Sequence, residues 1–127
     1  MRTYIKINSS LRQEMMTMFD ISRNSLYENL NGLTKSKLGE DIRAYALSHG
    51  GQMVCEAYMP ACTTAKTSVG MAQTFDNGIV VLLDIAENSA RIMRDDRELA
   101  KYEEVTLDRW ANILWMAQTW DLDKMES

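Results

Sequence analysis

Residues 19–32, FDISRNSLYENLNG, carry the signals of a short helix with a defined start and end. Ser22 is suited to cap the start of a helix, because its hydroxyl can accept a hydrogen bond from the backbone of the first turn. Gly32 is suited to the position just beyond a helix end. Leu26 and Leu30 lie one helical turn apart and therefore share one face. These features predict a helix that begins at Ser22 and points its leucines inward.

A second helix is predicted just before this one. Ser10 begins the pattern Ser-x-x-Gln, which is typical of a capping box, and apolar residues follow it at helical spacing. If that helix ends near Phe19, a turn of about three residues joins the two helices, with Ile21 between them. This layout predicts a helix-turn-helix. The apolar stripe of the first helix comprises Leu11, Met15, Met18 and Phe19.

The same stretch resembles the helix-turn-helix of the lac repressor and λ-repressor-like families, whose pattern is roughly Gly-Val-Ser-x-x-Thr-Val-Ser-Arg-x-Leu-Asn-Gly. Ser22 and residues 30–32 match that pattern outright, whereas Asp20 stands where the families usually have Gly. The clear match covers about residues 10–50. More loosely, the whole chain is similar to small regulator-like proteins of Bacteroidetes phages and mobile elements, in which a helix-turn-helix half precedes a short β-rich tail.

The resemblance implies a DNA-binding transcriptional regulator whose recognition helix, near residues 22–31, lies in the major groove of double-stranded DNA. It implies that Arg23 and Asn24 contact guanine and adenine edges, and that Glu28 accepts from a cytosine amine or stays in water. It further implies phosphate contacts that hold the helix in register. The residues placed for those contacts are Ser25, Tyr27, Asn31, Lys35 and Lys37.

The C-terminal half predicts a short antiparallel β-meander and a closing helix. Asn77 and Gly78 form a hairpin signal between two runs that favour strands, and Thr106 suits the start of the last helix. The small, polar residues 61–70 are typical of a mobile loop or linker. The apolar stripe of the last helix comprises Leu107, Trp110, Ala111, Leu114 and Ala117.

The predicted fold class is therefore α+β. A short strand over residues 3–8 precedes the three-helix unit, and the third helix is expected to start at Thr34 or Ser36. The predicted division gives a helix-turn-helix unit in residues 1–51, a strand and flexible connection in 52–74, and the meander with its amphipathic helix in 75–127.

Tryptophan recurs every five residues, at positions 110, 115 and 120, so the three rings cannot share one helical stripe. So wide an apolar surface on a terminal helix favours a subunit interface, where Trp is enriched. Trp115, Trp120 and Met116 are the predicted interface residues of a homodimer, which would suit a protein that contacts two DNA half-sites. The alternative is a small domain that wraps its last helix closely.

The composition is that of a globular chain of one or two small domains: 127 residues, 46% hydrophobic and 25% charged. No apolar run approaches the roughly 20 residues of a spanning helix, and the N-terminus lacks the apolar core of a signal peptide. A cytoplasmic location is therefore expected. Cys55 and Cys62 agree with it as unpaired thiols, although an oxidising compartment would allow a disulfide.

The net charge of −4 is unevenly distributed. Residues 1–50 carry seven basic and five acidic side chains, whereas residues 51–127 carry seven basic and thirteen acidic ones. This asymmetry permits a basic working surface on an acidic chain. A continuous positive face formed by Arg23 with Arg12, Lys35 and Lys37 would favour DNA binding, with a shallow salt dependence because the cations are few.

No enzymatic role, cofactor or metal is expected, because the chain has one histidine, His49, and no catalytic or metal-binding motif. The alternative function is a protein-interaction or structural module of a mobile element that keeps the helical shape without binding DNA. Its acidic half would suit a basic partner.

Overall fold

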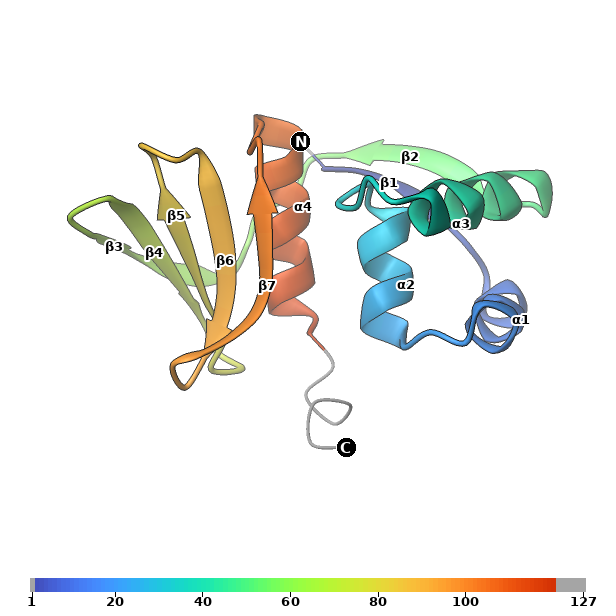
Figure 1. Ribbon diagram of the computed structural model, residues 1–127, viewed down its shortest axis with the longest axis horizontal. Coiled ribbons are helices and arrows are strands. Elements are labelled where there is room, and N and C mark those ends of the chain that lie inside the picture. The colour runs from blue at the N-terminus through green and yellow to red at the C-terminus, as the bar shows by residue number, and fades with distance from the viewer. Residues whose placement is uncertain (1, 121–127) are drawn as a thin grey trace. The chain divides into compact units, whose positions relative to one another are not determined.

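Figure 1 shows a computed structural model that describes residues 2–120. The chain is α+β, as predicted: within those residues it forms four α-helices, a two-stranded antiparallel sheet and a five-stranded antiparallel sheet. It divides into two compact units, residues 2–57 together with Trp120 (unit 1) and residues 58–119 (unit 2). Residues 1 and 121–127, which the predicted first and third regions include, lie outside the described residues.

In unit 1, three helices lie between two strands along the chain, and the two strands pair directly with each other. β1 pairs antiparallel with β2, so that Arg2 lies opposite Glu56 and Lys6 opposite Gln52. A strand is predicted in both segments, over residues 3–8 and within residues 52–74, but the sequence does not predict that the two strands pair. The elements are β1 (Arg2–Lys6), α1 (Ser9–Phe19), α2 (Arg23–Leu30), α3 (Lys37–Ser48) and β2 (Gln52–Glu56).

Polar side chains set the helix starts in unit 1. Ser22 and Ser36 cap α2 and α3, and their hydroxyls accept hydrogen bonds from the backbone of the first turn. The cap of α1 differs from the prediction: the Asn8 side chain accepts from the Leu11 amide at 2.8 Å, so the helix begins before Ser10. Asn is as favourable a helix cap as Ser, and capping by Asn8 places Ser9 and Ser10 within the first turn of the helix.

The core of unit 1 forms where the apolar faces of its three helices meet β1. Leu26 and Leu30 are buried, as their spacing predicted, but Met18 of the predicted α1 stripe remains 49% exposed. The buried cluster comprises Ile5, Leu11, Met15, Leu26, Leu30, Ile42 and Ala46.

Unit 2 is a meander in which each strand pairs with the next along the chain, followed by α4. Residues 61–70, expected to be a loop or linker, instead contain β3, which pairs with β4. The β-branched Thr63 and Thr64 favour this strand once a neighbour supplies its hydrogen bonds. The elements are β3 (Cys62–Lys66), β4 (Gly70–Phe75), β5 (Val80–Asp84), β6 (Ser89–Arg94), β7 (Arg97–Glu103) and α4 (Leu107–Gln118).

The predicted turn and cap signals of unit 2 are confirmed. Gly78 has a φ of +84° in the turn between β4 and β5, and the Thr106 hydroxyl accepts from the Arg109 amide at the start of α4. The Asn77 amide donates to the Ala117 carbonyl at 2.8 Å, which ties this turn to the end of α4. The predicted stripe is wrong at its first residue, because Leu107 is 83% exposed.

Candidate nucleic-acid interface

The turn between α1 and α2 has the left-handed geometry that the resemblance requires. Asp20 has φ 52° and ψ 54°, and its backbone N–H donates to the Met16 carbonyl. The Ile21 amide donates to the same carbonyl at 3.2 Å, and the Ile21 side chain packs against the core. Asp is one of the few residues other than Gly that adopt this conformation, because its short polar side chain can form local hydrogen bonds, so it replaces Gly at a modest cost. In Figure 1, α1 is viewed along its axis and α2 from the side, so the two helices cross.

Helix α2 presents a buried face and a polar face. Leu26 and Leu30 are at most 2% exposed, whereas Arg23, at the first helical position, is exposed. The remaining predicted contact residues of this helix, Asn24, Ser25, Tyr27 and Glu28, are all half-buried. At its N-terminal end the helix therefore offers Arg23 fully to solvent, and Asn24 and Ser25 only in part.

Two arginines contact Tyr27 beside that turn. The Arg12 Nη1 atom of α1 donates to the Tyr27 hydroxyl at 3.3 Å, and the Arg23 guanidinium carbon lies 5.4 Å from the centre of the Tyr27 ring. Cationic groups from both helices are thereby gathered on one side of unit 1. Arg12 was expected to extend a positive face but was not predicted as a contact residue, because the family pattern begins after it.

Asn31 does not lie where the resemblance placed it. Its side chain is 3% exposed; Nδ2 donates to the Tyr27 carbonyl at 2.6 Å, and Oδ1 accepts from the Arg2 Nε atom at 3.3 Å. The physical reason is its position as the C-terminal cap of α2, where backbone carbonyls need donors. Asn31 therefore stabilises the helix end and is removed from the phosphate-contact set.

Arg2 connects that helix end to the two-stranded sheet. Its buried guanidinium lies 2.7 Å from the Glu56 carboxylate and 3.8 Å from the centre of the Tyr4 ring. Burial, and then the negative charge of Glu56, raise the pKa of the Tyr4 hydroxyl. The contacts of Arg2 join β1, β2 and the end of α2. A buried arginine of this kind has no local sequence signal.

A second polar network fixes α2 against α3. The Arg43 Nη1 atom donates to the Asn29 carbonyl at 3.2 Å and to the Thr34 carbonyl at 3.3 Å. The Thr34 hydroxyl donates to the Asn29 side chain, whose own amide donates to the Ser25 carbonyl at 2.7 Å. Gly39 leaves room for this network, since a methyl group there would lie 2.4 Å from the Thr34 hydroxyl oxygen. These contacts hold α2 in one position, which favours recognition by a rigid element.

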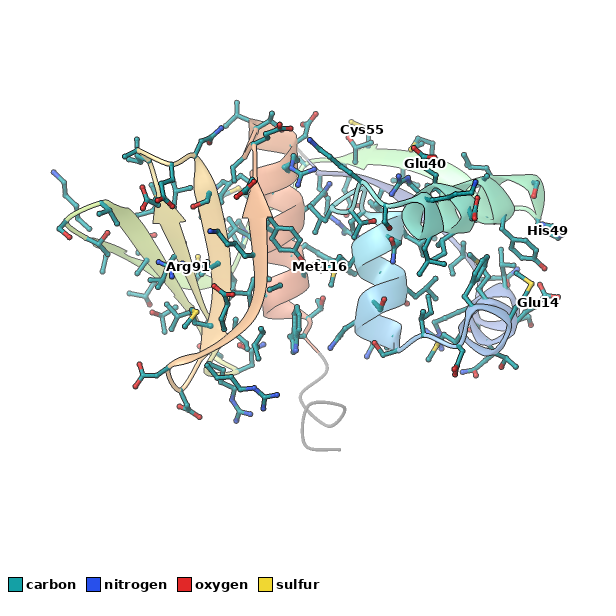
Figure 2. The ribbon with its side chains drawn as sticks, viewed as in Figure 1. Glu14, Glu40, His49, Cys55, Arg91 and Met116 are labelled. Atoms are coloured by element: carbon teal, nitrogen blue, oxygen red, sulfur yellow. The ribbon has the colours of Figure 1, made fainter. Side chains whose placement is uncertain are left out.

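The remaining predicted cations lie on the segment that enters α3. Lys35 and Lys37 are both exposed, and Lys37 is 3.8 Å from Asp41 in a solvent-exposed ion pair that is worth little. The acidic Glu14 lies elsewhere on unit 1: burial, and then a hydrogen bond to Glu14, raise the pKa of Tyr45 on α3. Figure 2 labels Glu14 on α1 and His49 at the end of α3, and the His49 ring stacks on Tyr45 at 3.8 Å.

The predicted interface residues differ in how far they are buried. Met116 of α4, labelled in Figure 2, is 2% exposed, so its side chain is covered within the chain. Trp115 is half-buried on the same helix, whereas Trp120 lies beyond its end and groups with unit 1. The stripe pattern misplaced Met116 because α4 buries a wider face than the five predicted positions.

Comparison with known proteins adds no family, since no protein-family model, curated protein or solved structure matches the chain. Among residues 2–120, no cluster of three or more potential metal-ligating side chains occurs, and no helix has the length and apolar character needed to cross a membrane. Cys55, exposed on β2 in Figure 2, and Cys62, whose thiol pKa is raised by burial, form no disulfide.

Proposed function

We propose that unit 1 is the DNA-binding part of a transcriptional regulator of the lac repressor and λ-repressor-like type, which lays α2 in the major groove. The observation that carries the proposal is the left-handed turn at Asp20, which joins α1 to a Ser22-capped helix that begins with the exposed Arg23. Arg23 and Asn24 lie at the start of that helix, where side chains of a recognition helix contact bases. Glu28, one turn further along, contacts a cytosine amine.

Phosphate contacts come from both sides of α2. Tyr27 and Ser25 lie on the helix itself, and Arg12 joins the set through its hydrogen bond to the Tyr27 hydroxyl. Lys35 and Lys37 extend the positive surface after the helix end. Because so few cations take part, the affinity should fall only shallowly with salt, with a slope of about one for each phosphate neutralised.

The regulator is proposed to act in the cytoplasm as a homodimer, because two copies of α2 would contact the two halves of a symmetric site. Half-sites one helical turn apart are the usual spacing for this motif. Trp115 remains a candidate for the dimer surface, since a half-buried Trp is typical of such interfaces.

The test is selection of bound sequences from random duplex DNA by the purified full chain. The double variant Arg23→Ala with Asn24→Ala should lose the selected sequence, because it removes the proposed base contacts. The matched control is Lys6→Ala with Gln52→Ala, which also removes one cation and one amide. Those two exposed residues face each other on the two-stranded sheet and should leave the selected sequence unchanged.

The alternative is a protein-interaction module. Two features favour it because they weaken the positive face: the ion pair between Lys37 and Asp41, and the exposed Asp20. If neither the wild type nor the double variant enriches any sequence at low salt, the DNA proposal is overturned and the interaction module remains. An enriched sequence that survives the double variant would keep DNA binding but move the contacts away from α2.

A further inference from the structure

Unit 2 contains an apolar pocket of about 370 Å³ that unit 1 does not contribute to. β4 and the end of β5 form one wall with Met71, Leu83 and Ile85, and the start of α4 forms the other with Val105, Leu107 and Trp110. The volume lies near the lower end of the range for small-molecule sites, roughly 300–1,000 Å³.

The sheet geometry explains why this hollow exists. Met71 and Leu83 are opposite each other in the β4–β5 register, so both side chains lie on one face of the sheet. Gly70 allows the two strands to approach closely there, since a methyl group at Gly70 would lie 2.1 Å from the Leu83 carbonyl oxygen. Helix α4 begins at Leu107, and its first turn leaves this end of the apolar face open.

The rim of the pocket keeps large apolar side chains in water. Leu107 is 83% exposed and Ile85 is 67% exposed, although the apolar pattern of α4 predicted Leu107 to be buried. Covering such side chains with an apolar occupant is favourable in proportion to the area removed from water. Trp110, half-buried in the lining, adds a large aromatic surface for contact.

The lining offers no charged partner to a bound molecule, so a charge there is costly. None of its eight residues carries a formal charge, and its polar side chains are Asn88 and Thr106. The Thr106 hydroxyl oxygen accepts from the Arg109 amide at 3.3 Å, which leaves its O–H to donate to an occupant. The charged residues next to the lining in sequence are mostly acidic, which disfavours an anion further; they are Asp84, Glu87, Glu104 and Asp108, with Arg109 as the exception.

We propose that this pocket binds a small, uncharged, mainly apolar molecule that carries one hydrogen-bond acceptor. The molecule would contact Trp110 and accept a hydrogen bond from Thr106. The ligand site lies within unit 2 and does not depend on DNA binding by unit 1. The two proposals therefore stand or fall separately.

The test measures fluorescence of two probes that share one ring system, neutral N-phenyl-1-naphthylamine and its anionic sulfonate analogue, with the full chain. The neutral probe should saturate at one molecule per chain and bind about tenfold more tightly than the anion, because an uncompensated charge is costly in an apolar site. Equal affinity for the two probes, or no saturable binding, would overturn the proposal.

Variants locate the site. Ile85→Glu with Leu107→Glu should weaken the neutral probe about tenfold or more by replacing the apolar rim. The matched control, Met53→Glu with Met59→Glu, alters two methionines that are 61% and 88% exposed and lie outside the pocket, and it should leave the affinity unchanged. All four residues are exposed, so both variants should fold, which circular dichroism checks. If both variants weaken binding of the neutral probe equally, the proposal is overturned. It is also overturned if the probe binds more weakly at higher protein concentration, because a second copy of the chain would then be the occupant of the pocket.

Discussion

Units 1 and 2 both contain antiparallel sheets, but they close those sheets by different routes. In unit 1 the paired strands are the first and last elements, and three helices lie between them. In unit 2 each strand pairs with its neighbour in sequence. Closing a long loop costs more chain entropy than closing a hairpin, so the first route needs specific contacts between distant residues. Arg2, with partners on β2 and at the end of α2, supplies them in unit 1.

The two routes leave each unit vulnerable at a different place. A meander is held by many local hydrogen bonds, so a substitution harms it chiefly by preventing two adjacent strands from approaching. A unit closed through its ends is harmed when one long-range contact is removed. Substitutions at these places should therefore destabilise the two units to different extents.

Gly70→Ala should destabilise unit 2 by about 3 kcal/mol, because its methyl group would lie 2.1 Å from the Leu83 carbonyl oxygen and both clashing atoms belong to the backbone or to Cβ. Gly78→Ala is the matched control. Gly78 has a φ of +84° and its nearest neighbouring atom is 3.7 Å away, so it should lose only about 1 kcal/mol through backbone strain. Hydrogen exchange of the β4 and β5 amides measures both losses. Equal losses would show that strand approach is not limiting.

Arg2→Ala should destabilise unit 1 by about 2 kcal/mol, because Asn31 and Glu56 lose a charged donor and the Asn31 side chain is buried. Lys6→Ala removes a cation from the same strand, but Lys6 is exposed, so the change should be less than about 0.5 kcal/mol. Denaturant unfolding, with exchange of the α2 amides to assign the loss, measures both. If Arg2→Ala cost no more than Lys6→Ala, closure through the chain ends would not depend on this contact.

The contrast also explains what the sequence could predict. The start and inward face of α2 follow from Ser22 and two leucines, all local signals, and the turn at Gly78 follows from an Asn-Gly pair. Alternation predicted that β1 is a strand but contains no information about its partner. The prediction of a loop at β3 is wrong because its small, polar residues show no apolar alternation. The strand depends instead on pairing with β4, which the local sequence does not reveal.

In the candidate site, Arg23 is exposed, as a base contact requires, whereas Asn31 is buried, which a phosphate contact does not allow. A family pattern records which residue types recur at a position. A polar residue that matches the pattern can either contact a ligand or cap the end of its helix. Only the burial of Asn31 and its contact with Arg2 distinguish the two roles. The pocket in unit 2 was missed for a similar reason, since periodicity predicted that Leu107 would be covered by its own chain.

Asp20→Gly should stabilise unit 1 by about 0.5 kcal/mol, because Gly adopts the left-handed conformation without strain but loses more entropy on folding. Asp20→Ala should be destabilising, since it keeps a Cβ atom and loses the local hydrogen bonding of Asp. Thermal unfolding compares the three chains. Both variants remove one negative charge near α2, so both should bind DNA more tightly if the proposed function holds. A destabilised Asp20→Gly chain would contradict the interpretation of the turn.

The smallest expected effect is the dependence of unit 1 stability on alkaline pH. The folded pKa of Tyr4 is raised above its ordinary value of 10.0, first by burial and then by the charge of Glu56. As the pH rises through 10.0, the unfolded chain ionises at this hydroxyl before the folded chain does, so stability present below that pH is progressively lost above it. Tyr45 shifts in the same direction, so the wild type alone cannot isolate Tyr4. Tyr4→Phe should therefore lose less stability than the wild type between about pH 9 and pH 11, as measured by denaturant midpoints. Parallel losses in the two chains would mean that folding does not raise the pKa of the Tyr4 hydroxyl, and that neither its burial nor the charge of Glu56 acts on it.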